Sequence, residues 1–166
     1  MNKSIRRYAT KQGAITGVST VILCLIIFSL LVTSGVQLSI IFSDLSITIG
    51  STGLICGFIQ VLILKGPVKK GAVPLIGNLD DQAAYLLVPK NVVAFLLYLT
   101  IVEVLLFAFA PIGIISMFIS NGGEISRISY ILLKALLAGA AAGYSAYHAN
   151  IFVCSLYQQK LKVAEE

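Results

Sequence analysis

Four long apolar runs constrain the fold of this chain more than any other feature of its sequence. We place them at about 13–34, 45–64, 91–118 and 128–157. An α-helix of about 20 residues crosses the hydrocarbon core of a bilayer, and each run has that length or more. Hydrophobic residues make up 58% of the chain and charged residues only 11%, which is outside the composition of ordinary soluble domains. The sequence therefore predicts an integral membrane protein.

Lipid offers the backbone no hydrogen-bond partners, so membrane segments form either helices or closed barrels. The alternating segments that mark a membrane barrel are absent. The first apolar run is too long for a signal peptide, and no small-residue cleavage site follows it. We therefore expect an all-α fold in which residues 1–166 form a single four-pass transmembrane domain. Its architecture is predicted to be an up-down-up-down four-helix bundle embedded in the lipid bilayer.

The basic residues predict the orientation of these helices. Ten of the twelve lysines and arginines lie before the first run, in or beside the long connection 65–90, or after the last run. Cytoplasmic loops carry an excess of such residues. We therefore expect both termini and the 65–90 loop to be cytoplasmic, in the plasma (inner) membrane, with the connection near 35–44 as an outer loop. No basic domain or aromatic reading surface indicates nucleic-acid binding.

Polar residues inside the third and fourth runs form the candidate site. Glu103 lies near the middle of the third run, and Thr100 shares its helical face. In the fourth run, Lys134, Ser145 and His148 fall on one helical stripe, with alanines between them. A hairpin of these two runs brings the stripe beside Glu103. We predict a buried polar group, and a possible ion or proton site, formed by these five residues.

The free-energy cost of a membrane carboxylate limits what Glu103 can be. A charged carboxylate at the bilayer centre costs at least about 2.5–3.5 kcal/mol. We therefore expect Glu103 to face other helices and to be either paired or protonated. Three interpretations stay open at this point. Glu103 forms an interhelical clamp with Lys134 or Ser145, or it is part of a proton- or cation-linked relay, or it contacts another membrane subunit.

Small residues predict where the helices touch. A G-x-x-x-G pattern occurs in the first, second and fourth runs, and such patterns let helix backbones approach closely in lipid. The residues are Gly13 and Gly17, Gly53 and Gly57, and Gly139 and Gly143. Packing inside one bundle accounts for all three patterns, and contacts in a homo-oligomer are the alternative.

The sequence carries no signature of catalysis, such as H-E-x-x-H, G-x-S-x-G or a phosphate-binding glycine loop, so we do not expect an enzyme. The cysteines show no metal-binding spacing, and we expect no metal and no cofactor. Two functions remain. The chain is either an ion- or proton-linked transport protein that acts as an oligomer with Glu103 as its titratable site, or a non-catalytic accessory or assembly subunit bound to a larger membrane-protein partner.

Overall fold

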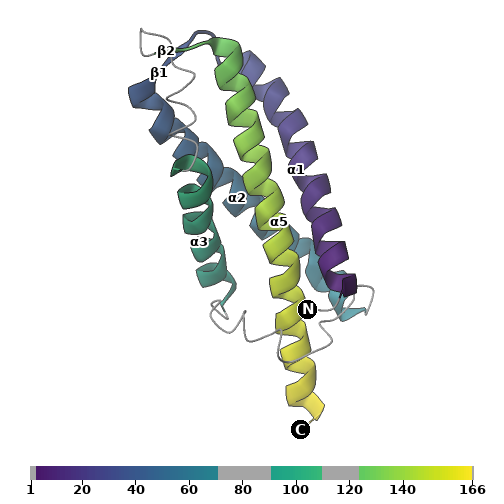
Figure 1. Ribbon diagram of the computed structural model, residues 1–166. Coiled ribbons are helices and arrows are strands. Elements are labelled where there is room, and N and C mark those ends of the chain that lie inside the picture. Colours follow the sequence, from purple (N-terminus) through teal and green to yellow (C-terminus); the bar gives the residue numbers. More distant parts are fainter. Residues whose placement is uncertain (1–2, 71–90, 110–123, 166) are drawn as a thin grey trace.

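The computed structural model describes residues 3–70, 91–109 and 124–165, and nearly all of them are helical (Figure 1). The helices are α1 (Lys3–Leu31), α2 (Leu38–Lys69), α3 (Val92–Glu103), the π-helix η2 (Val104–Phe109) and α5 (Arg127–Glu165). The predicted all-helical class is confirmed.

Two very short strands bring distant parts of the chain together. Strand β1 (Val36–Gln37) follows α1, and strand β2 (Glu124–Ile125) precedes α5. They pair antiparallel, with Val36 opposite Ile125. The ladder therefore fixes the connection between α1 and α2 beside the first turn of α5.

Arg127 strengthens the same junction. Its guanidinium donates hydrogen bonds to the backbone carbonyl of Val32, at 2.6 Å, and to that of Ser29, at 2.8 Å. The last carbonyls of a helix have no partner inside the helix, and a cation there also interacts favourably with the helix dipole. Arg127 thus caps the C-terminal end of α1 from the start of α5.

Three described helices contain segments that are long and apolar enough to cross a membrane. These segments are Arg6–Leu31, Ile40–Val68 and Arg127–Leu156. The apolar helix Val92–Phe107 is shorter, and residues 110–118, the end of the predicted third run, lie outside the described residues. Three membrane-capable helices are therefore established, and the fourth crossing stays a prediction.

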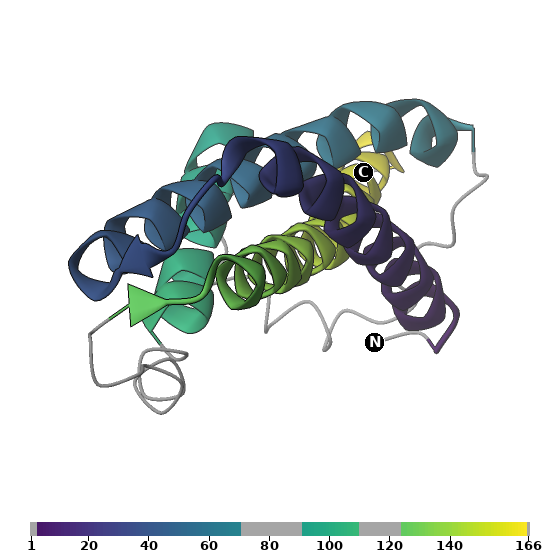
Figure 2. The ribbon, with the colours of Figure 1, turned by 90° about the horizontal axis from the view of Figure 1, so that it is seen from above.

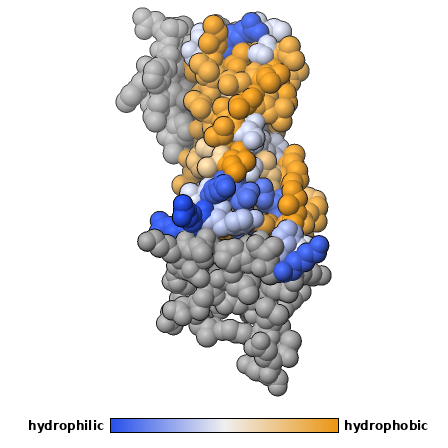
Figure 3. Space-filling model, turned by 90° about the vertical axis from the view of Figure 1, so that its right-hand side faces the viewer, coloured by the Kyte–Doolittle hydropathy of each residue, from blue (hydrophilic) through white to orange (hydrophobic). Residues whose placement is uncertain are grey.

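The outer surface of α1 is suited to lipid. Its exposed side chains are large and apolar, for example Val18, Ile22, Ile26 and Leu30. Figure 3, which views the molecule from the α1 side, shows a broad hydrophobic band with hydrophilic side chains above and below it. Such a band is what a bilayer requires of the surface it surrounds.

The helices extend beyond the predicted apolar runs. Helix α1 begins at Lys3 rather than near residue 13, and α5 continues to Glu165. Helix α2 begins at Leu38, so most of the expected outer loop 35–44 is helical. Hydropathy marks only the part of a helix that suits lipid, whereas backbone hydrogen bonds continue the helix into more polar sequence.

Helix α5 is the centre of the described structure, as Figures 1 and 2 show. Half of its most apolar window is buried, compared with 6% for α1. It packs against both α1 and α2, whereas α3 packs mainly on α2. The alanine- and glycine-rich sequence of α5 explains this position, because small side chains let neighbouring backbones come close.

The crossing of α1 and α5 depends on four of the predicted packing glycines. A Cβ atom added at Gly13 would lie 2.8 Å from the carbonyl oxygen of Gly143, and one added at Gly17 would lie 2.9 Å from that of Gly139. Backbone atoms cannot move aside as a flexible side chain can. The two G-x-x-x-G patterns therefore face each other within one chain.

Among the described residues, the interior contains three apolar clusters, and the two larger ones both draw on α2, α5 and the continuous α3–η2 segment. One is built around the stacked rings of Phe95 and Phe152, whose centroids are 4.0 Å apart. The other includes Ile49 and Tyr130. On each of these helices, the stretch between residues of the two larger clusters contains one residue of a further contact. These residues are Gly53, Glu103 and Ser145.

Candidate functional site

The candidate site is the place where α2, α3 and α5 meet at Gly53, Glu103 and Ser145, with Glu103 at its centre. We call it the three-helix junction. Glu103 is the last residue of α3 and is 0% exposed. Its Oε1 atom lies 2.5 Å from the Oγ atom of Ser145 on α5. The same Oγ atom lies 2.9 Å from the carbonyl oxygen of Gly53 on α2. One serine hydroxyl therefore links a buried carboxyl group to the backbone of a third helix.

The second carboxyl oxygen of Glu103 is sealed against α2. Among the described residues, Oε2 has no hydrogen-bond partner. It lies so close to Gly53 that a Cβ atom at that position would overlap it. Gly57, one turn further along α2, is also close, because a Cβ atom there would lie 3.4 Å from the Ser145 Oγ atom. This glycine pattern accommodates polar side chains, whereas the other two bring backbones together.

Lys134 does not lie in this junction. Its Nζ atom donates to the Asp44 carboxylate at 2.6 Å, and the Tyr130 hydroxyl donates to the same oxygen. The ammonium group also lies 4.7 Å from the centroid of the Phe28 ring, within reach of a cation–π attraction. The interpretation of Glu103 as a clamp with Lys134 therefore does not describe this structure.

Sequence reasoning missed Asp44 because it fell in the segment expected to be an outer loop. The early start of α2 places it on a helix that packs against α5. One sequence signal was available. Tyr130 precedes Lys134 by four residues, and such a pair lies on one helical face, ready to share a partner.

The structure gives the remaining predicted site residues, Thr100 and His148, contacts with residues other than Glu103. Thr100 donates its hydroxyl hydrogen to the carbonyl of Leu96 in its own helix, at 2.9 Å. The His148 ring packs against the rings of Tyr144 and Tyr147, with centroids 4.3 and 5.1 Å away. The predicted stripe of α5 therefore divides into three environments, and of its members Ser145 is the one bonded to Glu103.

A change of helix type begins immediately after Glu103. Residues Val104–Phe109 form the π-helix η2, in which backbone hydrogen bonds span one residue more than in an α-helix. Long π-helical stretches are rare, and π-helical turns occur frequently at functional sites. The irregular backbone thus coincides with the buried carboxyl group, although no apolar pattern in the sequence indicates it.

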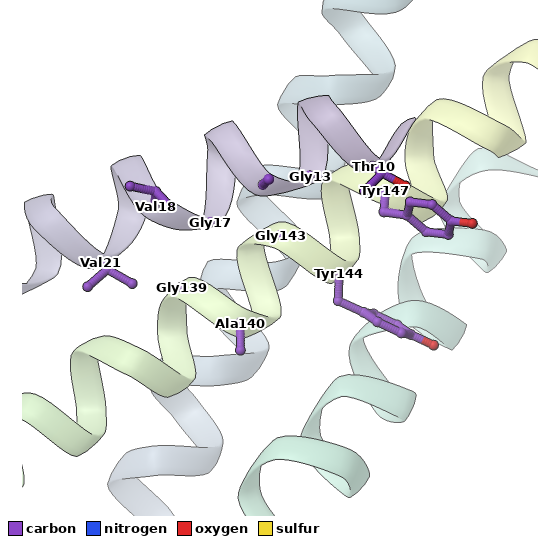
Figure 4. Close-up of a pocket in the computed structure, with 11 residues that line it drawn as sticks. Thr10, Gly13, Gly17, Val18, Val21, Gly139, Ala140, Gly143, Tyr144 and Tyr147 are labelled. Carbon is purple, nitrogen blue, oxygen red and sulfur yellow. The ribbon is translucent and has the colours of Figure 1, made fainter. Parts of the chain in front are cut away.

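A groove lies on the opposite side of α5, between α1 and α5 (Figure 4). Its volume is about 460 Å³. The close contact of the four glycines forms part of its wall, and Ala140, Tyr144 and Tyr147 line it from α5. The groove is mainly apolar in lining and does not include Glu103.

Within residues 3–70, 91–109 and 124–165, no group of three or more His, Cys, Asp or Glu side chains is arranged to hold a metal ion. Comparison with known proteins finds no matching family, no similar curated protein and no similar solved structure. The function must therefore be argued from the geometry of the chain itself.

Proposed function

We propose that the chain is a multi-pass membrane protein that transports an ion or proton, or couples one to transport, with Glu103 as the binding group. The observation that supports this function is the buried carboxyl group at the three-helix junction, which forms no ion pair with any described residue. Ionisable groups within the membrane are costly and are functional by default. The π-helix next to Glu103 adds a second sign of a functional position.

A comparison within the molecule favours an ion-binding role over a structural clamp. Asp44 has both an ammonium group and a phenol hydroxyl as donors. Glu103 is more deeply buried, yet no described basic side chain forms an ion pair with it. A buried carboxylate that carries its charge needs a compensating charged partner. Glu103 is therefore better explained as a group that gains and loses a small cation or a proton.

The proposal includes a topology. We place both termini and the 65–90 connection in the cytoplasm, with four crossings of the plasma (inner) membrane, because ten of the twelve basic residues then lie on the cytoplasmic side. A single narrow bundle has its centre filled by side chains. Transport is therefore assigned to an oligomer of the chain.

The test is ion flux in proteoliposomes. An imposed pH gradient is followed with a trapped pH dye, and imposed Na⁺ and K⁺ gradients are tested in parallel. Glu103→Gln preserves the shape of the side chain and removes its charge, so we expect flux to fall at least tenfold. Ser51→Ala is the control, because Ser51 is exposed and its hydroxyl donates to a carbonyl of its own helix, and it should retain flux. Equal flux in wild type and Glu103→Gln would contradict the proposal.

A second candidate function is that of a non-catalytic accessory or assembly subunit. The groove between α1 and α5 favours it, because a large apolar hollow at a lipid-facing surface can receive a helix of a larger membrane partner. This function needs no ion at Glu103. Variants at Glu103 and variants in the groove therefore distinguish the two candidate functions.

A further inference from the structure

The hydrogen bonds at the three-helix junction can be counted atom by atom. The Ser145 hydroxyl carries one hydrogen, and the Gly53 carbonyl can only accept. Oγ of Ser145 lies within hydrogen-bonding distance of both the Gly53 carbonyl oxygen, at 2.9 Å, and Oε1 of Glu103, at 2.5 Å. Two contacts therefore depend on one serine hydrogen, unless Glu103 supplies a second.

We infer that Glu103 is a proton-binding site and that the described arrangement is its protonated form, with Oε1 donating to Ser145 and Ser145 donating to the Gly53 carbonyl. This chain of donors satisfies every contact. Each of the three groups then has the role that its chemistry allows. A separation of 2.5 Å between the two oxygens requires a hydrogen between them.

The ionised form fits the same geometry poorly. A carboxylate only accepts hydrogen bonds, so the single Ser145 hydrogen would serve either Glu103 or Gly53. The other contact would then bring two oxygen lone pairs together without a hydrogen between them. In addition, Oε2 would be a charged oxygen with no described donor, sealed against Gly53. Buried charges are tolerated only when they are paired and hydrogen-bonded.

A metal cation in place of the proton also fits poorly. The oxygens of Glu103 and Ser145 are hard ligands of the type that Mg²⁺ and Ca²⁺ accept. However, cation–oxygen distances of about 2.0–2.6 Å separate neighbouring octahedral ligands by roughly 3 Å or more. The separation of 2.5 Å is shorter. The described arrangement therefore fits a hydrogen between these two oxygens better than a metal ion bound to both.

The other titratable groups near Glu103 do not change this count. Cys56 on α2 and Tyr144 on α5 interact electrostatically with Glu103, and cysteine and tyrosine side chains are ordinarily neutral at physiological pH. From η2, the described neighbours are apolar, as Phe107 is. Lys134, on α5, is engaged with Asp44. No described group thus offers Glu103 a compensating positive charge.

Loss of the proton should loosen the attachment of α3. Helix α3 packs mainly on α2, and Glu103 is the polar residue that links it to α5. An ionised carboxyl group cannot remain in this sealed position, so α3 and η2 must separate from the junction or admit water. The proton-loaded form is then the more closed of the two forms at this junction. A role of this difference in transport rests on the proposed function, whereas the protonation itself does not.

The test is infrared spectroscopy of the full-length protein, reconstituted in lipid at neutral pH. A protonated carboxyl group gives a C=O stretching band that a carboxylate lacks. We expect wild type to show this band and Glu103→Gln to lose it. Asp44→Asn is the matched control, because Asp44 forms an ion pair with Lys134. The band should remain in this variant. Absence of the band in wild type, or its persistence in Glu103→Gln, would overturn the inference.

A second variant keeps the test decisive if Glu103→Gln does not fold. Ser145→Ala removes the acceptor of the Glu103 hydrogen, so the band should move to higher wavenumber. An unmoved band would assign it to another acid and contradict the inference. The flux measurement is independent of this result. A band that depends on Glu103, with flux that does not, would retain the proton site and reject the transport function.

Discussion

At the scale of single residues, the carboxyl groups of Asp44 and Glu103 differ in their exposure and in their partners. Asp44 has a side chain that is 37% exposed and is paired with Lys134 at 2.6 Å. Glu103 is fully buried, and its described hydrogen-bonding contact is with a serine hydroxyl. The more buried group would need the stronger partner if both were charged. This contrast is the main reason to treat Asp44 as structural and Glu103 as titratable.

The first prediction concerns the space that Gly53 leaves for Glu103. Gly53→Ala should lower the free energy of unfolding by about 1–3 kcal/mol, because the new Cβ atom overlaps Oε2 and the buried side chain must shift. Denaturant unfolding in mild detergent measures the change. Gly66→Ala on the same helix is the control, since nothing lies within 4 Å of its added Cβ atom. Equal stability of the two variants would contradict this view of the junction.

At the scale of helices, α5 contacts each neighbouring helix through a different kind of interaction. Two glycine pairs bring it against the backbone of α1. The ion pair of Lys134 with Asp44 links it to the first turns of α2. Ser145 links it to both α2 and α3. Helix α3 contacts α5 through this hydrogen bond and through the stacked rings of Phe95 and Phe152, and it packs mainly on α2.

The second prediction concerns the ion pair between α2 and α5. Lys134→Met should destabilise the protein by about 1–3 kcal/mol, because it leaves the Asp44 carboxylate without its cation. Asp44→Asn combined with Lys134→Met should recover part of the loss. The two sites should show a coupling free energy of about 0.5–3 kcal/mol in a double-mutant cycle of unfolding. Strict additivity would mean that the pair does not hold these helices together.

At the scale of the whole molecule, the described surface has two main features, an apolar band and a groove. The band over α1 is suited to lipid (Figure 3). The groove between α1 and α5 is a hollow in that surface (Figure 4). It lies away from the carboxyl junction, so a partner bound there and an ion bound at Glu103 would be recognised by different residues.

The third prediction separates the accessory-subunit function from transport. Ala140→Trp places a large side chain in the groove at an exposed position of α5. If a larger membrane protein binds there, its co-purification in mild detergent should fall at least tenfold. Leu136→Trp is the control, because it is exposed one turn away and does not line the groove. Unchanged recovery of the partner with both variants would place binding elsewhere.

Hydropathy predicted the helical class and the positions of the membrane-capable segments, because the requirement for long apolar helices is local to each run. It also indicated that Glu103 would avoid lipid, since the cost of exposing a carboxylate there does not depend on the details of the fold. The ends of the helices were less predictable. The polar turns of α1 and α2 continue as helix without an apolar signal.

The sequence by itself determined that this chain is built from membrane helices and that a carboxyl group lies among them. The tertiary structure alone decided the partners of that group. The choice of Ser145 for Glu103, and of Asp44 for Lys134, depends on the rotation of each helix and on the start of α2. A rotation of one residue turns a side chain by about 100° on a helix of 3.6 residues per turn, which is enough to exchange one partner for another.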